Sequence, residues 1–95
     1  MYFHIFGFQW KPEATDAQKA RAAKDILAFQ GMIPGLIEVH YGVNSSAHNQ
    51  GYTNAGLMRF KDKAALDAYQ VHPQHRALLE WLVPLITPVE LDIQG

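Results

Sequence analysis

Short segments rich in aromatic and β-branched residues predict four β-strands in this chain. The first, Tyr2–Trp10, is apolar on both of its alternating faces, which indicates that both faces are covered. Leu36–Val43 and about Thr53–Phe60 have the composition of two further strands. A last strand is predicted from three apolar residues that alternate with polar ones, Val89, Leu91 and Ile93.

A helix is predicted between the first two strands. Thr15 and Gln18 have the spacing of a capping box, in which each side chain accepts a hydrogen bond from the other residue's backbone N–H. An apolar stripe then continues for about fifteen residues to Gln30, and Gly31 suits the position after the last helical residue.

The second helical segment contains an interruption. Asp62 can cap a helix that runs to about Val71. Pro73 cannot continue this helix, because it lacks an N–H and pushes His72 out of the helical conformation, but it suits the first turn of a new helix. We therefore expect two helical pieces that meet at His72, and Pro84 should disturb the end of the second piece.

The resulting order, β-α-β-β-α-β, is the ferredoxin-like motif of the α+β class, an antiparallel four-stranded sheet with the helices on one face. The other face of the sheet would expose Phe3, Ile5, Ala55 and Leu57. Since a large exposed apolar face favours association, we expect a homodimer in which two such faces pack together as an α/β barrel. The space inside each subunit, between sheet and helices, could hold a ligand.

Length and composition narrow the picture further. The 95 residues predict one domain that spans positions 1–95. A net charge of −1 provides no basic surface for nucleic acid, and no apolar run is long enough for a signal peptide or a membrane span. We expect a cytoplasmic protein that binds neither nucleic acid nor membranes. The absence of cysteine excludes disulfides and thiol nucleophiles.

The candidate chemistry lies in the interrupted helical segment, where three polar side chains recur at intervals of three residues: Tyr69, His72 and His75. Groups that exchange protons near neutral pH are costly to bury unless they have a partner. On the first strand, His4 has the same parity as Phe6 and Phe8 and therefore faces the helices. The pattern indicates a group of inward-facing proton-transfer residues.

Each of these residues also has a structural interpretation. His72 precedes Pro73, where its ring can cap the second helical piece, and we favour that role for it. His75 can be a core histidine that bonds a backbone carbonyl, and Tyr69 can be a buried phenol with a single partner. His72 and His75 alone form an incomplete ligand set, so no metal site is expected.

Several residues follow a pattern that extends over almost the whole chain: His4, Thr15–Lys19, Phe60-Lys61, Leu66 and the run Tyr69-x-x-His72-Pro73-Gln74-His75. Through them the sequence resembles the stress-responsive dimeric α/β-barrel (Dabb) family. The resemblance implies a ferredoxin-like fold and a homodimer. The family includes plant stress proteins, bacterial proteins of unknown role, and a cyclase that closes a linear polyketide by aldol condensation.

For cyclase-type members the resemblance implies that His75 is the general base, that Tyr69 polarises the substrate carbonyl and that His4 orients the substrate, without a cofactor. A neutral imidazole can take a proton from a carbon between two carbonyls while a phenol stabilises the enolate. The expected pocket walls are Phe6, Phe8, Ala23, Ile26, Met58, Leu66 and Leu78. Phe6 and Phe8 are bulky where the cyclase pattern has smaller aliphatic residues, which leaves the substrate open.

Two classes of function follow from the sequence. In the first, the dimer binds a compact apolar or aromatic carbonyl compound in an intrasubunit cavity, with cofactor-independent cyclase, lyase or isomerase chemistry. In the second, it is a stress-responsive or structural dimer whose inner histidines serve the fold alone. An open apolar pocket reached by His75 and Tyr69 favours the first class, and a filled interior favours the second.

Overall fold

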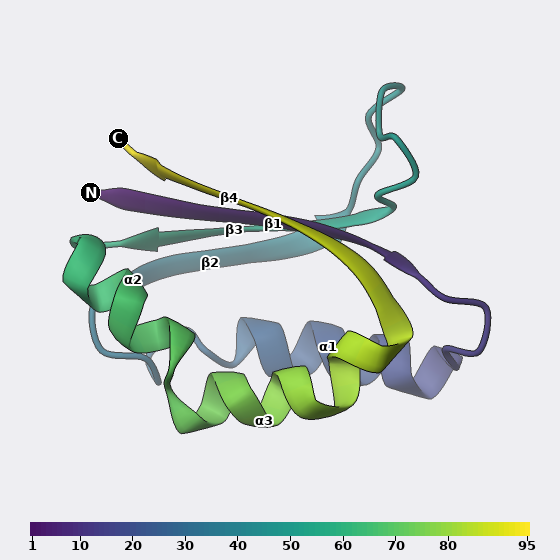
Figure 1. Ribbon diagram of the computed structural model, residues 1–95, viewed down its shortest axis with the longest axis horizontal. Coiled ribbons are helices and arrows are strands. Elements are labelled where there is room, and N and C mark those ends of the chain that lie inside the picture. Colours follow the sequence, from purple (N-terminus) through teal and green to yellow (C-terminus); the bar gives the residue numbers. More distant parts are fainter.

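The computed structural model describes residues 1–95 and has one four-stranded sheet with helices on one face (Figure 1). All strand pairs are antiparallel, and the strand order is β2-β3-β1-β4. The ferredoxin-like α+β fold expected from the sequence is therefore confirmed. The elements in chain order are β1 (Tyr2–Trp10), α1 (Asp16–Leu27), β2 (Leu36–Val43), β3 (Asn54–Phe60), α2 (Lys63–Gln70), α3 (Pro73–Leu82), the short 3-10 helix η1 (Val83–Leu85) and β4 (Ile86–Gln94).

The hydrophobic core lies between the sheet and the helices. Figure 1 shows α1 and α3 side by side under one face of the sheet, whereas the opposite face carries no helix. Buried apolar side chains from both layers form a single cluster, in which Phe8, Met58 and Phe60 are the largest of the fully buried side chains. None of the helices is long and apolar enough to cross a membrane.

The first helix is shorter than its apolar stripe indicated. Its capping box is present, and the Thr15 hydroxyl oxygen accepts a hydrogen bond from the Gln18 backbone N–H at 3.1 Å. The helix ends at Leu27 instead of Gln30, which corrects the predicted boundary. The next residues wind more tightly, with the Phe29 amide bonded to the carbonyl three residues earlier, and this turn carries the Phe29 ring into the core.

The second helical segment breaks where Pro73 predicted. α2 ends at Gln70, His72 has an extended ψ of 138°, and α3 begins at Pro73. The ring Nδ1 of His72 accepts a hydrogen bond from the Gln74 backbone N–H at 3.1 Å. Both the break and the capping role of His72 are therefore confirmed.

Two strands begin at other positions than the sequence indicated. β3 begins at Asn54, one residue after Thr53. β4 begins at Ile86, well before the alternating residues that start at Val89, because it pairs with β1 along the whole of that strand and places Ile86 opposite Trp10.

A glycine on β3 allows one aromatic ring to lie close against the sheet. Gly56 is opposite Phe6 on β1, and the Phe6 ring occupies the space that a Cβ at position 56 would need. The same ring stacks on Tyr41 and on Phe8, with centroid separations of 6.2 and 6.5 Å. A side chain at position 56 would therefore push the Phe6 ring away from β3.

We expect Gly56→Ala to lower the free energy of unfolding by about 1–3 kcal/mol, the usual cost of overpacking a core. Chemical denaturation would measure this change. Gly42→Ala on β2 is the matched control, because a Cβ at that position meets no other atom within 4 Å. Combining Gly56→Ala with Phe6→Leu should give a smaller loss than the sum of the two single changes. A Gly56→Ala variant as stable as the wild type would contradict this packing.

Candidate functional site

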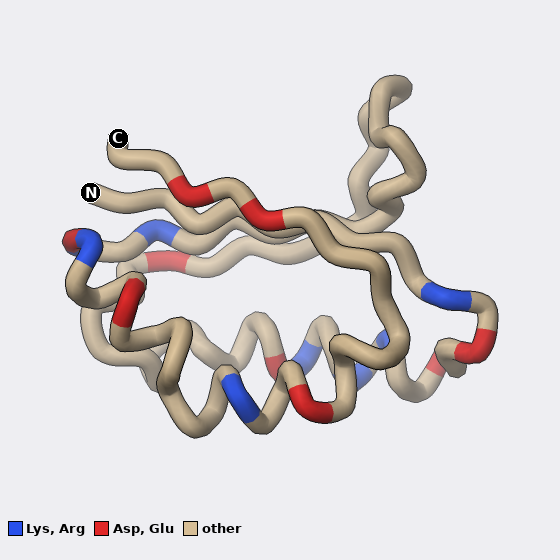
Figure 2. Tube along the Cα trace, viewed as in Figure 1, with Lys and Arg blue, Asp and Glu red and all other residues tan.

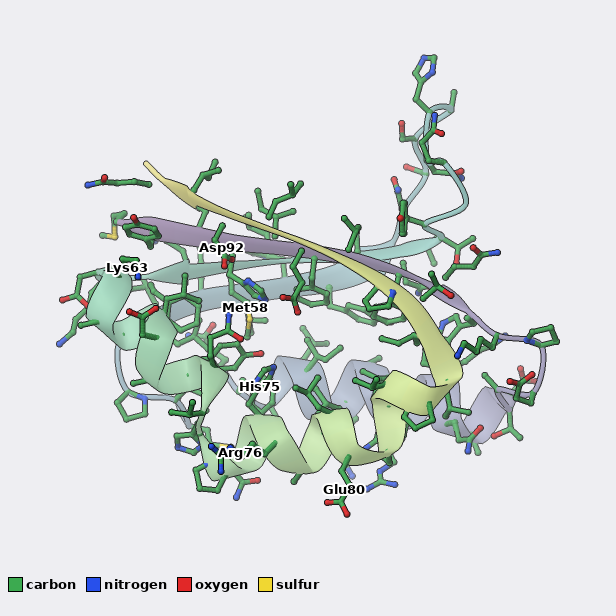
Figure 3. The ribbon with its side chains drawn as sticks, in the orientation of Figure 1. Met58, Lys63, His75, Arg76, Glu80 and Asp92 are labelled. Carbon is green, nitrogen blue, oxygen red and sulfur yellow. The ribbon has the colours of Figure 1, made fainter.

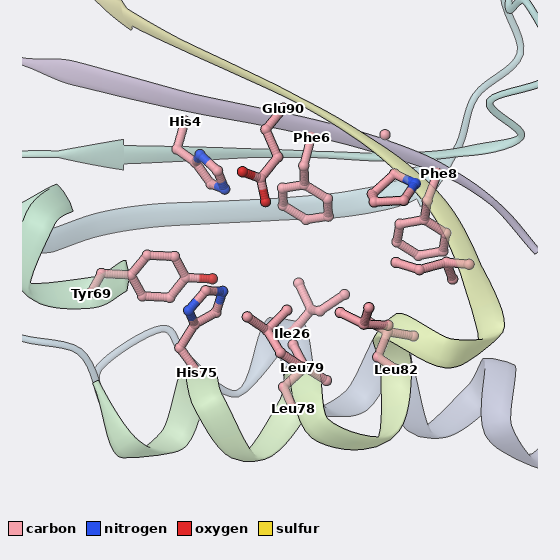
Figure 4. A pocket seen from close by; sticks show the side chains of 14 residues that line it. His4, Phe6, Phe8, Ile26, Tyr69, His75, Leu78, Leu79, Leu82 and Glu90 are labelled. Carbon is pink, nitrogen blue, oxygen red and sulfur yellow. The ribbon is translucent and has the colours of Figure 1, made fainter. Parts of the chain in front are cut away.

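A cavity of about 70 Å³ lies between the sheet and the helices, next to the edge strand β4 (Figure 4). Its lining residues come from β1, α1, α2, α3, η1 and β4. The three predicted proton-transfer residues and four of the predicted wall residues are among them: His4, Tyr69, His75, Phe6, Phe8, Ile26 and Leu78. The fold thus brings together side chains from both ends and the middle of the chain.

The other three predicted wall residues do not line this cavity. Ala23 lies in a surface groove with Trp10 and Leu27, on a flank of α1 that does not face the cavity. Met58 on β3 and Leu66 on α2 are buried in the closed part of the core. For Met58 the reason is the strand order. The cavity adjoins β4, and β1 separates β4 from β3.

Tyr69 and His75 are in direct contact across the helix break. Their ring centroids are 4.2 Å apart, and each residue is 4% exposed. His4 lies opposite them on β1, 2% exposed, with its ring 6.0 Å from that of Tyr69 (Figure 4). The Tyr69 hydroxyl and the Nε2 atoms of both histidines make no hydrogen bond within the chain, and none of them is sealed in the core. These three atoms can therefore bond a ligand in the cavity.

One hydrogen bond determines which nitrogen of His75 can act as a base. Nδ1 of His75 lies 3.3 Å from the backbone carbonyl oxygen of Gln70, which can only accept, so Nδ1 carries the hydrogen. In the neutral ring the free lone pair is therefore on Nε2. Burial is the main cause that lowers the pKa of His75; the bond to Gln70 opposes this effect, and nearby His4 adds to it. At neutral pH the ring is consequently uncharged and able to accept a proton.

Burial acts on Tyr69 in the opposite direction. It raises the pKa of the phenol well above its ordinary value of 10, and the carboxylate of Glu90 adds to the increase. Tyr69 therefore keeps its proton and is a hydrogen-bond donor. A neutral base in contact with a neutral donor is a suitable pair for general acid–base catalysis.

A carboxylate that the sequence analysis did not identify orients His4. Asp92 lies opposite His4 in the pairing of β1 with β4, and its Oδ1 is 2.5 Å from Nδ1 of His4. Because Asp92 holds Nδ1, the other ring nitrogen, Nε2, is left for the cavity (Figure 4). Asp92 thus fixes the direction of the His4 ring.

Glu90 is a second acidic residue that the sequence analysis missed, and it lines the cavity. It lies two residues before Asp92 and on the same face of β4. The available signal was the alternation of Val89, Leu91 and Ile93. If these apolar residues face away from the helices, the acidic residues between them must lie on the helix-facing side of the sheet.

The remaining histidines lie outside the cavity. His72 is used as a helix cap, and His40 is paired with Glu38 at 3.1 Å on the exposed surface of β2. No group of three or more His, Asp or Glu side chains is placed to hold a metal ion.

The cavity is small for a binding site. Pockets for drug-sized ligands usually enclose roughly 300–1,000 Å³, whereas this one encloses about 70 Å³. The rings of Phe6 and Phe8 project from the sheet and take up part of the interior (Figure 4). The space left suits a compact and largely apolar group, and a larger one would require the Phe6 ring to move.

Comparison with known proteins agrees with this fold. The profile of the stress-responsive A/B barrel domain matches residues 3–93. The olivetolic acid cyclase of Cannabis sativa is 28% identical over 74 residues, which cover 76% of this chain and 73% of the cyclase.

Two solved structures show the same architecture. The At3g17210 protein of Arabidopsis thaliana superposes with a TM-score of 0.89 at 20% identity, over 100% of this chain and 95% of that one. A dimeric ferredoxin-like protein of unknown function from Jannaschia sp. CCS1 superposes with a TM-score of 0.87 at 27% identity, over 99% of this chain and 98% of that one. The likeness to the first protein concerns the fold alone.

The neutral, buried state of His75 predicts a stability that depends on pH. Folding lowers its pKa below the ordinary value of 6.5, so the unfolded chain binds a proton at His75 that the folded chain resists. The stabilising contribution is therefore present above about pH 6.5 and is lost as the pH falls toward the lowered pKa. When the pH is lowered from about 7 to about 5, we expect the melting temperature of His75→Gln to fall less than that of the wild type.

His48→Gln is the matched control, because His48 is exposed in the loop between β2 and β3. This variant should keep the pH dependence of the wild type. If His75→Gln also had the same pH dependence as the wild type, His75 could not be the group responsible.

Proposed function

Since the chain belongs to the stress-responsive A/B barrel domain family, we propose that it binds a compact apolar or aromatic carbonyl compound in the cavity and moves a proton on that compound without a cofactor. The observation that carries the proposal is the contact between His75 and Tyr69, with Nε2 and the hydroxyl both free for a ligand. The likeness to olivetolic acid cyclase supports an aldol type of reaction.

In this mechanism Nε2 of His75 removes a proton from a carbon next to the bound carbonyl. The electron pair of the broken C–H bond moves into the carbonyl, which becomes an enolate. The Tyr69 O–H donates a hydrogen bond to the enolate oxygen and stabilises the charge that develops there. The nucleophilic carbon can then attack a second carbonyl of the same molecule, and the imidazolium returns its proton to the new alkoxide.

His4 has the role of a positioning group on the opposite wall. Asp92 fixes its ring, so Nε2 points at the substrate from the sheet side while His75 and Tyr69 act from the helix side. A substrate held between two layers has few orientations available, which favours one geometry of attack.

Two observations favour the alternative, a structural dimer without catalysis. The hydrogen bond from His75 to the Gln70 carbonyl is typical of a core histidine, and Phe6 and Phe8 leave only a small cavity. Under this alternative the ring pair of Tyr69 and His75 packs the helix break and nothing enters the space beside it.

We also propose that two chains associate through the helix-free face of the sheet. Ile5 on β1 lies between Leu57 on β3 and Leu91 on β4, and Leu91 is 57% exposed in the single chain. Ile93 adds to the same exposed face. A contiguous apolar patch of this kind favours a second copy of the sheet, and the related Jannaschia protein is described as dimeric.

Catalysis can be tested with acetylacetone, a compact compound whose acidic carbon lies between two carbonyls. We expect the wild-type protein to accelerate exchange of its central protons for deuterium, followed by NMR. His75→Ala should reduce the rate above background by about 10²-fold or more, the range for loss of a general base. Tyr69→Phe should reduce it less, because the ring stays and only one hydrogen bond is lost.

His48→Ala is the control for this assay and should leave the rate unchanged. A wild-type rate equal to that of the buffer would support the structural alternative. A His75→Ala variant as fast as the wild type would place the chemistry elsewhere.

The proposed dimer is tested by placing a charge on the apolar face. Leu91→Arg should convert the protein to a monomer in analytical ultracentrifugation at micromolar concentration, because an unpaired guanidinium would be buried between the sheets. Leu27→Arg is the control, since Leu27 is similarly exposed but lies on α1, on the helix side. A wild type that sediments as a monomer would refute the assembly.

A further inference from the structure

Glu90 is a charged residue of the cavity to which the proposed mechanism assigns no step. It lies on β4 opposite Phe6, and Figure 4 shows its carboxylate directed into the cavity beside His4 and Phe6. Neighbouring Asp92 is bonded to His4, but no ion pair within the chain involves Glu90. Its charge is therefore available to whatever occupies the cavity.

Glu90 marks the open side of the cavity. It is exposed and belongs to the edge strand, whereas His75 and Tyr69 are buried. The preceding residues on the same face of β4, Ile86 and Pro88, are apolar. β4 carries acidic residues and no basic ones, so no cation on this strand neutralises the carboxylate (Figure 2).

The charge of Glu90 acts on the catalytic pair in the direction that proton transfer needs. Burial is the main cause of both shifts, since it raises the pKa of Tyr69 and lowers that of His75, whereas the Glu90 carboxylate has a smaller effect that raises both pKa values. For Tyr69 this effect keeps the proton on the phenol. For His75 it favours the imidazolium that forms when the ring takes a proton from the substrate.

We propose that Glu90 contacts the bound ligand and selects compounds that carry an O–H or N–H group at the end opposite the reacting carbonyl. This inference rests on the proposed function. A ligand whose carbonyl bonds Tyr69 deep in the cavity has its other end at the mouth, where the carboxylate of Glu90 can accept a hydrogen bond. The same carboxylate repels a ligand that carries a carboxylate there, because two like charges would meet beside apolar walls.

The test uses two ketones that differ only at this end, para-(hydroxymethyl)acetophenone and para-acetylbenzoate. Their dissociation constants for the isotope-labelled protein are measured at neutral pH by NMR titration. The wild type should bind the alcohol at least about tenfold more tightly than the carboxylate. Glu90→Gln should remove most of this difference, and Glu90→Asp should retain part of it because the charge is kept.

Glu80→Gln is the matched control. Glu80 lies on α3 and points away from the cavity, so this change removes the same charge without touching the proposed site (Figure 3). Its preference should equal that of the wild type.

If Glu90→Gln kept the full preference of the wild type, the role of Glu90 would be refuted while ligand binding in the cavity would stand. If neither ketone bound the wild type with shifts at the cavity residues, the proposed function would fail, and the inference about Glu90 would fail with it.

Discussion

The candidate site depends on the interruption of one helix at Pro73. On an unbroken helix, Tyr69 and His75 would point roughly 120° apart, because six residues complete one and two-thirds turns. The break brings their rings to a separation of 4.2 Å. In a continuous helix the backbone N–H of Gln74 would donate to the Gln70 carbonyl. At the break this N–H donates to the ring of His72 instead, which leaves the Gln70 carbonyl free. The released carbonyl then accepts from His75, so the same break sets both the contact and the tautomer.

Burial determines the charge state of the pair that the break assembles. It lowers the pKa of His75 and raises the pKa of Tyr69, so both side chains are neutral at neutral pH. Aromatic packing around Phe6 limits the space beside them, and the missing side chain at Gly56 lets that ring lie against β3 instead of farther into the cavity. Packing therefore controls the size of any ligand as directly as it controls the protonation of the groups that would act on it.

The features that could be predicted from the sequence are those encoded within one or two helical turns. The cap at Asp62 and the break at Pro73 depend only on neighbouring residues, and the strand parity of His4 depends only on position. The pairing of strands that lie far apart in the sequence could not be predicted in this way. Asp92 meets His4 from 88 residues away, through the register of β4 on β1. Met58 was assigned to the pocket wall because an apolar pattern does not show which edge of the sheet the cavity adjoins.

The edge strand β4 connects the two surfaces on which function would depend. Leu91 faces the proposed second subunit, whereas on the opposite face of β4 Glu90 lines the cavity and Asp92 is bonded to His4. A shift of β4 by one residue would exchange these faces. Leu91 would then lie on the cavity side, and the carboxylates of Glu90 and Asp92 would lie on the proposed dimer face. Pairing with β1 along its full length, which brings the two chain ends together in Figure 1, opposes such a shift. Association through one face would therefore also stabilise the strand register that aims His4 into the cavity on the other face.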